Sequence, residues 1–276
     1  MSDAVSVRRA LTASGLVPLD AQVLLAHVLG VPRAWLAAHA ADALPPQAAD
    51  AFLALAKRRR DGEPVAHLTG QREFWGLTLR VTPDVLIPRP ETETLIELAL
   101  ALVPEGRAAR MADLGTGSGA IALALARARP LAQVTGTDVS AAALAVARDN
   151  ARRLGIANVT FLASDWFASL GDARFDLIAS NPPYVAAADP HLGEGDLRFE
   201  PRVALSPGGD GLTALRSIIA GASAHLVPGG HLVVEHGYDQ SAAVQDLFRD
   251  AGFERVTIRN DLAGIARVVG GTLPGA

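Results

Sequence analysis

The sequence predicts an α/β protein with a mostly parallel sheet, and three observations support that fold class. From Arg110 onward, short strand patterns alternate with helical patterns, as in a doubly wound sheet. The last two predicted strands, 255–258 and 265–269, follow each other without a helix, so they must pair antiparallel. Before this region, residues up to about Arg60 keep the apolar spacing of helices. We therefore expect an N-terminal helical domain and a C-terminal domain whose sheet ends in an antiparallel hairpin.

Composition narrows the class of protein further. The 276 residues are 50% hydrophobic but only 5% aromatic, so Ala, Leu and Val must fill the core. A formal net charge of -4 argues against a dedicated nucleic-acid binder. The absence of Cys excludes disulfides, a thiolate nucleophile and a Cys-ligated metal. There is no signal-peptide pattern and no apolar run of the ~20 residues that span a bilayer, so we expect a cytoplasmic protein without a membrane partner.

The helical N-terminal part ends in a basic run, 57–60. Residues 1–80 carry nine Lys and Arg against seven Asp and Glu, a net charge of +2. Cations at a helix C-terminus complement the helix dipole, so a solvated helix end explains the run. The alternative hypothesis is that this basic cap helps to dock a partner on RNA or on the ribosome.

A short extended region follows. Residues 74–81 alternate as a strand, 85–87 form a second one, and 82–84 have the composition of a turn, which predicts a β-hairpin. A helix then begins after Glu91 or Thr92, either of which could cap it. We expect a helical domain over 1–72, a hairpin linker over 73–90 and the α/β domain over 91–276.

The α/β domain contains five further predicted strands and four helices. The strands are 111–114, 133–137, 159–162, 175–179 and 231–235, and the helices are 121–128, 140–154, 211–226 and 240–251. Ligands bind at the carboxyl ends of strands in open α/β sheets, so the residues that follow these strands are the candidates for a site.

A glycine loop follows the first of these strands. Its residues are Gly115, Thr116, Gly117, Ser118 and Gly119. Glycines at such a position let the backbone turn tightly and approach a ligand closely. The loop alone fits NAD(P), S-adenosylmethionine or a packing turn without a ligand.

Acidic residues at three strand ends favour the methyl donor S-adenosylmethionine. Asp113 lies where it could meet the amino-acid end of the ligand, directly or through water. Asp138 could accept both ribose hydroxyls, and Asp165 with Trp166 suits an adenine amine and ring. Taken singly, Asp138 could be a capping residue and Trp166 a packing residue.

The stretch Asn181-Pro182-Pro183-Tyr184 follows the strand 175–179. Two prolines make a stiff loop, because proline cannot continue a sheet ladder. An amide oxygen, a fixed carbonyl and an aromatic ring suit a planar –NH2 group. A proline-rich turn with a surface Tyr is the plain alternative, and the position at a strand end of a methyl-donor sheet favours the amine clamp.

With these residues in view, the sequence resembles the HemK/PrmC family, the glutamine methyltransferases of peptide chain release factors. The resemblance covers essentially the whole chain. The motifs that carry it are 74–77, 87–93, 113–119, Asp138, 181–184, Glu200-Pro201 with Ala204-Leu205, 208–212, and 235–237 with Gln240. Ser118 departs from the usual Thr but keeps a hydroxyl. The resemblance implies a class I S-adenosylmethionine-dependent methyltransferase, Rossmann-like with a seven-stranded sheet, and a helical N-terminal domain that helps to dock the release factor.

The expected reaction is direct methyl transfer from the sulfonium to the N5 amide nitrogen of a glutamine, which the family implies to be that of a Gly-Gly-Gln motif. We expect catalysis by positioning. Asn181 and the Pro182 carbonyl would each accept one N–H, Tyr184 would pack on the amide plane, and Pro183 would fix the loop. The glycine loop, Asp138, Trp166 and Asn181 would bind the cofactor. No metal site is expected.

Three other functions are compatible with parts of this pattern. A ribosomal-protein glutamine methyltransferase shares the glycine loop and the clamp, but such enzymes usually carry Ser-Pro after Ile-Pro-Arg, where this chain has Pro90-Glu91-Thr92-Glu93. An adenine methyltransferase uses the same clamp logic, but this chain lacks an evident basic region for DNA, so no direct DNA binding is expected. The third is a non-catalytic adaptor that only holds a nucleotide. We expect a monomer, with release factors as partners.

Overall fold

The structure is a computed structural model that describes residues 5–275. The chain forms two compact units, Met1–Gln71 and Arg72–Ala276, and each is described by itself. The outermost residues of the predicted domains, 1–4 and 276, lie outside the described residues.

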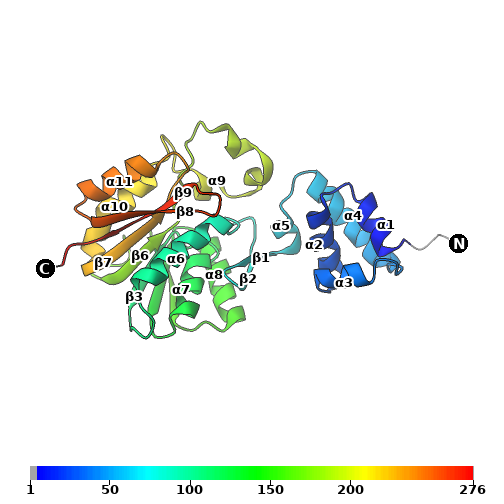
Figure 1. The fold of residues 1–276 in the computed structure, drawn as a ribbon, viewed down its shortest axis with the longest axis horizontal. Helices are drawn as coiled ribbons and strands as arrows, with labels where there is room; N and C mark the ends of the chain where they lie inside the picture. The colour runs from blue at the N-terminus through cyan, green and yellow to red at the C-terminus, as the bar shows by residue number, and fades with distance from the viewer. Residues whose placement is uncertain (1–4, 276) are drawn as a thin grey trace. The chain divides into compact units, whose positions relative to one another are not determined.

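The first unit is helical. Its helices are α1 (Val7–Ala13), α2 (Pro18–Leu29), α3 (Arg33–Ala38), α4 (Pro46–Arg60) and α5 (Val65–Thr69) (Figure 1). The Ser6 hydroxyl caps α1 by accepting from the Arg9 backbone N–H, and prolines begin α2 and α4, where a missing N–H costs no hydrogen bond. Leu24, Leu25 and Phe52 are fully buried at its centre. The apolar residues at helical spacing in the sequence therefore form a small hydrophobic core in this unit.

Every cation of the basic run at the end of α4 has a partner within the first unit. Lys57 pairs with Asp61 at 2.9 Å, and Arg58 pairs with Glu63. Arg59 bonds Asp20 at 2.7 Å, and the Arg60 guanidinium donates to the Ser14 carbonyl. These contacts tie α4 to α2 and to the end of α1, so the run has a structural role in this unit. Docking of a partner by this run stays a hypothesis.

The predicted hairpin is real, but its turn lies elsewhere. The two strands are β1 (Gln71–Phe74) and β2 (Leu77–Arg80), and residues 85–87 form no strand. The predicted turn at 82–84 is present, because the Val85 N–H donates to the Thr82 carbonyl at 3.2 Å, but it does not join two strands, so the prediction that it closes the hairpin was wrong. Trp75 and Gly76 both have positive φ, 51° and 68°, as the two central residues of a tight hairpin turn require. A Trp rarely adopts that conformation, so the sequence concealed the turn.

Residues after the hairpin run without regular structure to a short 3₁₀ turn, η1 (Pro90–Thr92), which leads into α6 (Glu93–Leu102). Thr92 is the residue before α6, but its side chain makes no capping bond. The Glu91 side chain does not cap α6 either, because Glu91 lies inside η1. The carboxylate of Glu93 instead accepts from the Trp75 backbone N–H at 3.0 Å and holds the hairpin turn.

The second unit is built on a seven-stranded sheet, which confirms the predicted fold class. Its strands are β3 (Arg110–Leu114), β4 (Gln133–Asp138), β5 (Val159–Ala163), β6 (Phe175–Ser180), β7 (Leu226–Glu235), β8 (Glu254–Asn260) and β9 (Ala266–Thr272). They lie in the order β5-β4-β3-β6-β7-β9-β8. The first five run parallel, and β9 pairs antiparallel with both β7 and β8. The strand order reverses between β3 and β6, so a ligand crevice is expected there.

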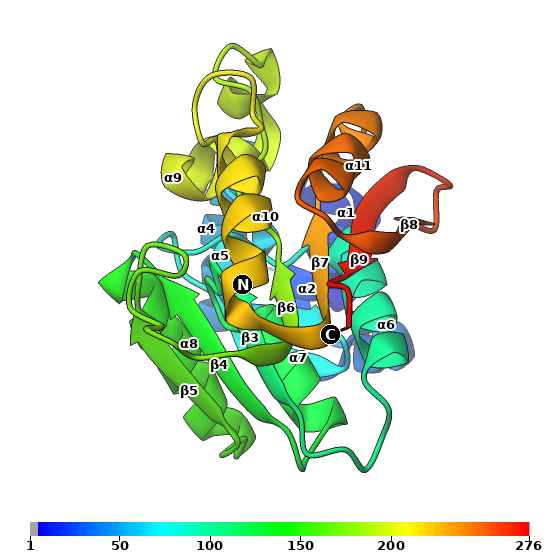
Figure 2. The same ribbon diagram turned by 90° about the vertical axis from the view of Figure 1, so that its left-hand side faces the viewer.

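Helices cover both faces of this sheet (Figures 1 and 2). They are α6, α7 (Ala120–Ala128), α8 (Ala141–Leu154), α10 (Thr213–His225) and α11 (Ser241–Asp250). Alternate strand residues serve the two faces: Leu177 packs with α6 and α7, whereas its neighbour Ile178 packs with α10 and α11. A strand with both faces covered reads as a continuous apolar run, which explains the predicted strands.

A long connection links β6 to α10. It contains the short turns η2 (Pro190–Gly193), η3 (Gly195–Phe199) and α9 (Arg202–Leu205). Within the described chain, no helix is long and apolar enough to cross a bilayer.

Candidate active site

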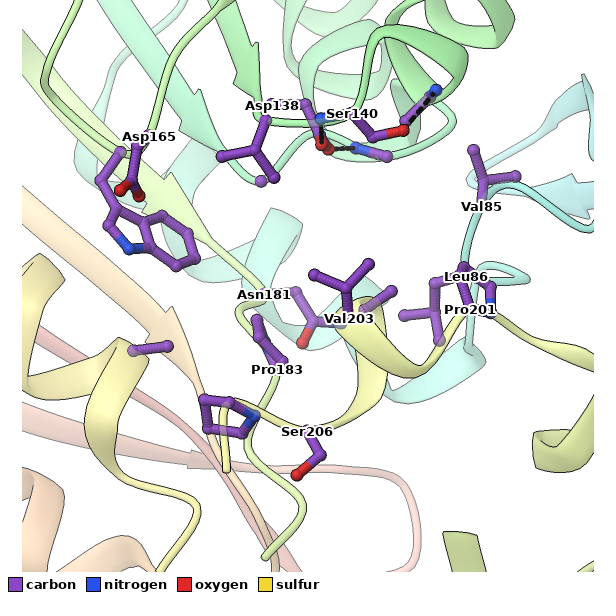
Figure 3. A pocket seen from close by; sticks show the side chains of 18 of the residues that line it. Val85, Leu86, Asp138, Ser140, Asp165, Asn181, Pro183, Pro201, Val203 and Ser206 are labelled. Carbon is purple, nitrogen blue, oxygen red and sulfur yellow. Dashed lines mark hydrogen bonds between the residues drawn. The ribbon is translucent and has the colours of Figure 1, made fainter. Parts of the chain in front are cut away.

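A cavity of about 460 Å³ lies at the carboxyl ends of β3 to β6. Parallel strands end at the same edge, so residues that follow different strands meet there. Figure 3 shows Asp138 and Ser140 on one side of the cavity, with Asn181, Pro183 and Val203 opposite. The strand-end prediction therefore identified one contiguous site.

The glycine loop forms one wall of the cavity. Gly115 and Gly117 line it, whereas Thr116 and Ser118 are buried and Gly119 is the residue that precedes α7. The backbone N–H groups of Gly115 and Thr116 both donate to the Thr137 carbonyl at 2.8 Å, which ties the loop to the end of β4. Three of the five predicted loop residues therefore shape the wall from behind.

Asp138 joins the glycine loop to the next strand end. Its Oδ2 atom accepts from the Gly117 backbone N–H at 2.9 Å, and its Oδ1 atom accepts from that of Ser140 at 2.8 Å. Each carboxylate oxygen can accept a second hydrogen bond. Asp138 lines the cavity, so it can receive the hydroxyls of a ligand while it holds the loop.

Asp113 lies behind the loop and not in the cavity. It is fully buried, and its Oδ2 atom accepts from the Thr116 hydroxyl at 2.6 Å and from the Ala122 backbone N–H at 3.0 Å. Burial raises the pKa of Asp113 to about 7, although the hydrogen bonds from Thr116 and Ala122 lower it. The structure therefore gives Asp113 a role in bracing the loop, and its predicted direct meeting with the ligand is not supported by its position.

Trp166 forms the wall next to the glycine loop. Its backbone is left-handed, with φ of 45°, and its carbonyl accepts from the Ser164 hydroxyl at 3.0 Å. A side chain on Gly115 would touch the indole ring, which shows how closely the loop and the ring pack. Asp165 lines the cavity with an exposed carboxylate. Together these residues offer an apolar plane beside an acceptor.

Asn181 and Pro183 line the cavity from the end of β6, and Pro182 between them is buried. The Asn181 side-chain nitrogen donates to the Thr92 hydroxyl oxygen at 3.0 Å. This bond holds the amide nitrogen on Thr92, so the Asn181 side-chain oxygen remains available as an acceptor.

Tyr184 does not line the cavity. Its hydroxyl donates to the Oε1 atom of Glu235 at 3.0 Å, and its ring packs against the core between the sheet and α10. Its carbonyl accepts from the Gln240 side chain at 3.0 Å. Burial and the neighbouring Glu235 raise the pKa of Tyr184, so the hydroxyl stays protonated. Its predicted packing on a substrate amide stays a prediction.

The wall opposite the glycine loop comes from 84–86 and from 201–207. The buried side chain of Glu200 joins these two segments: it accepts from the Ile87 backbone N–H at 2.9 Å and pairs with Arg89. Glu200 is only 5% exposed. Its burial and its contacts with Ile87 and Arg89 show that Glu200 links the two segments of this wall.

We expect Glu200→Gln to lower the free energy of unfolding by about 1–3 kcal/mol, because a buried acceptor is lost beside Arg89. Urea unfolding measures this change. Asp246→Asn is the matched control, since it removes an exposed ion pair with Arg249 and should cost under about 1 kcal/mol. Equal losses in the two variants would contradict a tether role for Glu200.

The structure brings together most of the predicted site residues and adds partners that the sequence did not reveal. Gly115, Gly117, Asp138, Trp166 and Asn181 share the cavity. The added partners are Thr92, Glu200, Glu235 and Gln240. These four act on the site through residues far away in the chain, and no local pattern marks such contacts. Among residues 5–275, no cluster of three His, Cys, Asp or Glu side chains is placed to hold a metal.

Two family models match the chain. The PrmC N-terminal domain matches residues 6–70, and the methyltransferase small domain matches residues 92–199. The first corresponds to the helical unit and the second to most of the strands around the cavity.

Relatives match over nearly the full length. The chain is 55% identical over 261 residues to a release factor glutamine methyltransferase of Bordetella pertussis, covering 94% of this chain and 96% of that protein. It is 54% identical over 271 residues to one of Burkholderia pseudomallei, covering 96% and 95%. Among solved structures, the 16S rRNA N2 G1207 methyltransferase of Thermus thermophilus, in complex with AdoMet and guanosine, has a TM-score of 0.54 at 24% identity, covering 74% of this chain and 49% of that one. This last likeness concerns the fold.

Proposed function

The chain belongs to the family of release factor glutamine methyltransferases, and we propose that it methylates the N5 side-chain amide of the glutamine in a release factor Gly-Gly-Gln motif. The observation that carries this proposal is Asn181: its amide nitrogen is held by Thr92, and its oxygen is left to accept from a substrate at the cavity. An acceptor on a rigid proline loop suits the planar –NH2 of a glutamine.

We propose S-adenosylmethionine as the methyl donor, and the residues at the cavity fit it. Asp138 offers carboxylate oxygens for ribose hydroxyls, and Trp166 with Asp165 offers a plane and an acceptor for adenine. Gly115 and Gly117 allow close approach of the backbone. Thr116, Ser118 and Gly119 would hold the loop in shape. When bound, this cofactor supplies a methyl group on a sulfonium centre.

Asp138→Ala is expected to weaken S-adenosylmethionine binding about 10- to 100-fold. The variant loses charge-assisted hydrogen bonds worth about 1.5–3 kcal/mol and frees the Gly117 N–H of the loop. Isothermal titration calorimetry measures the dissociation constant. Asp246→Ala makes the same change of charge on exposed α11 and should bind the cofactor as the unmodified protein does. Unchanged affinity in Asp138→Ala would remove Asp138 from the cofactor site.

The chain's contribution to the chemistry is positioning. A glutamine amide nitrogen is a weak nucleophile, because its lone pair is delocalised into the carbonyl. The Asn181 oxygen and the Pro182 carbonyl would each accept one N–H of the substrate amide, which directs the nitrogen's remaining lobe toward the donor. Pro183 keeps the backbone of the loop stiff. We propose that Tyr184 packs on the amide or, through Glu235, holds the loop that carries these acceptors.

The proton leaves after transfer. A nitrogen that has gained the methyl group is acidic, so it needs an acceptor and no strong base, and the hydrogen bonds to Asn181 and Pro182 already point from the substrate N–H groups to oxygen atoms. In this scheme the loop would keep the substrate N–H groups hydrogen-bonded to oxygen atoms during the reaction. It would not remove a proton before the methyl transfer.

Labelled S-adenosylmethionine and three separate acceptors test the proposal: a release factor, ribosomes and DNA. We expect label on the release factor alone, and its Gly-Gly-Ala variant should take up none. Transfer to a ribosomal protein or to adenine would overturn the choice of substrate. Since release factors act in translation termination, we place this reaction in the cytoplasm. We propose that the helical unit, whose residues 6–70 match the PrmC N-terminal domain model, docks the release factor.

A further inference from the structure

A buried polar cluster lies behind the amine clamp. It consists of Thr92 at the end of η1, Glu235 at the end of β7 and the hydroxyl of Tyr184. Thr92 and Glu235 are 4% and 1% exposed. A buried charge is costly unless hydrogen-bond donors surround it, so the presence of Glu235 in this cluster needs a functional or structural explanation.

The hydrogen bonds of this cluster connect both ends of the clamp. The Asn181 side-chain nitrogen donates to Thr92, and the Tyr184 hydroxyl donates to Glu235. The Thr92 hydroxyl is close enough to stabilise the charged Glu235 carboxylate and so lowers its pKa. The Oε2 atom of Glu235 is buried and has no hydrogen-bond partner among the described residues. The nearby Thr92 hydroxyl can donate to this atom, which would give a chain of donors from Asn181 through Thr92 to Glu235, with Tyr184 bonded to the other carboxylate oxygen.

The direction of this chain follows from the chemistry of its last member. An ionised carboxylate only accepts hydrogen bonds. A Thr92 hydroxyl that donates to Glu235 leaves its oxygen to accept from Asn181. Asn181 must then turn its nitrogen toward Thr92, as it does in the structure. The Asn181 oxygen then points the other way, as an acceptor for the substrate.

We propose that Glu235 and Thr92 are positioning residues that fix which atom of the Asn181 amide faces the substrate. This inference rests on the proposed function for its kinetic consequence, whereas the orientation of the Asn181 amide does not depend on it. Without the carboxylate, the Asn181 amide can rotate by half a turn and present its –NH2 group, which repels the N–H groups of a glutamine.

Glu235→Gln is the sharpest test, because glutamine keeps the shape but brings a donor. Its –NH2 group can donate to Thr92, whose hydroxyl then donates to the Asn181 oxygen and reverses the chain. We expect kcat to fall about 100-fold, with cofactor affinity changed less than about threefold. Glu254→Gln, on the exposed part of β8, is the matched control and should keep the full kcat.

Thr92 is tested with a pair of variants. Thr92→Val keeps the shape and removes the relay, so kcat should fall about 10- to 100-fold. Thr92→Ser restores a hydroxyl and should recover most of that loss. Equal activity of the Val and Ser variants would show that Thr92 acts only by packing, and the proposal would fail.

The rate should also depend on pH through Glu235. Burial raises the pKa of this carboxyl to about 7; Glu91 raises it further, while Thr92, Tyr184 and Arg267 on β9 oppose the rise. The neighbouring His236 is buried, with its Nδ1 atom bonded to the Gly237 carbonyl, and burial lowers the pKa of that ring. Above pH 7 the carboxylate only accepts, and kcat should reach its plateau. Below pH 7 the protonated carboxyl can donate, and kcat should fall. Glu235→Gln should lack this acid limb.

A readout independent of catalysis completes the test. The side-chain N–H₂ signal of Asn181, assigned by its loss in Asn181→Asp, should be protected from hydrogen exchange in the unmodified protein and exposed in Thr92→Val and Glu235→Gln. Absence of methyl transfer by the unmodified protein, with this protection intact, would overturn the proposed function alone. Normal kcat and unchanged protection in Glu235→Gln would overturn the positioning role.

Discussion

Asn181→Ala should lower kcat about 100- to 1,000-fold while S-adenosylmethionine affinity changes by less than about threefold. The variant removes one acceptor that is aimed at the transferring nitrogen, and losing one such preorganised hydrogen bond typically costs this much. It also leaves the Thr92 hydroxyl without the donor that it has in the structure. The cofactor wall on the opposite side, formed by Asp138 and Gly117, is untouched.

Single-turnover methylation of a release factor, alongside calorimetric titration of the cofactor, separates the two quantities. Asn260→Ala is the control, because Asn260 is an exposed asparagine at the end of β8. If Asn181→Ala loses cofactor affinity as strongly as it loses kcat, Asn181 is a binding residue and the clamp scheme is wrong. A kcat near that of the control would also exclude it.

The centre of the parallel sheet was predictable because its strands are covered on both faces. Such strands have sequences that are short apolar runs between helical patterns, and this holds for β3, β6 and β7. The antiparallel pair β8 and β9 followed from the missing helix between them. Because parallel strands end at one edge, the residues after them could be placed together without knowledge of the distances. This reasoning brought Asp138, Trp166 and Asn181 to one cavity.

The hairpin could not be placed correctly, because its turn depends on a conformation that the residue type disfavours. Trp75 adopts positive φ, and two carboxylates support that turn: Glu93 accepts from the Trp75 N–H and Glu73 from the Gly76 N–H. Pattern reasoning instead favoured the turn composition at 82–84. Tertiary contacts overrode the local preference.

The residues behind the site were hidden for a related reason. Thr92 is a residue type that often caps helices, yet its hydroxyl accepts a hydrogen bond from Asn181, 89 residues later. Glu200 has the appearance of a surface charge, yet it is buried against Ile87, 113 residues earlier. Such contacts have no periodicity and no fixed spacing, so only the folded chain reveals them.

These contacts share one consequence: the clamp is held at several points by residues outside it. Asn181 is held by Thr92, and Tyr184 by Glu235 and Gln240. Farther along, the Val185 N–H donates to the Leu205 carbonyl at 3.0 Å. A weak nucleophile that relies on positioning needs such a rigid frame. A change that moves the frame without touching the cavity should therefore reduce the rate.

Gly211→Ala makes such a change and should lower kcat about 100-fold. A methyl group on Gly211 would overlap the Tyr184 carbonyl oxygen, and it would stand 2.9 Å from the Gln240 side-chain nitrogen that bonds this carbonyl. Backbone atoms cannot yield as the end of a flexible side chain can, so the clamp itself must shift. A displacement of about 1 Å in a positioned group costs about 100-fold in rate.

Gly208→Ala separates this effect from backbone strain. Gly208 has φ of 83° and Gly211 has φ of 82°, so alanine strains both backbones alike, at about 1–2 kcal/mol. A methyl group on Gly208 meets nothing within 4 Å. Thermal unfolding should therefore show a loss in both variants, larger for Gly211→Ala, while kcat should fall only in Gly211→Ala. If both variants lose the same activity, strain in the turn and not displacement of the clamp limits the rate, and positioning by this frame is refuted.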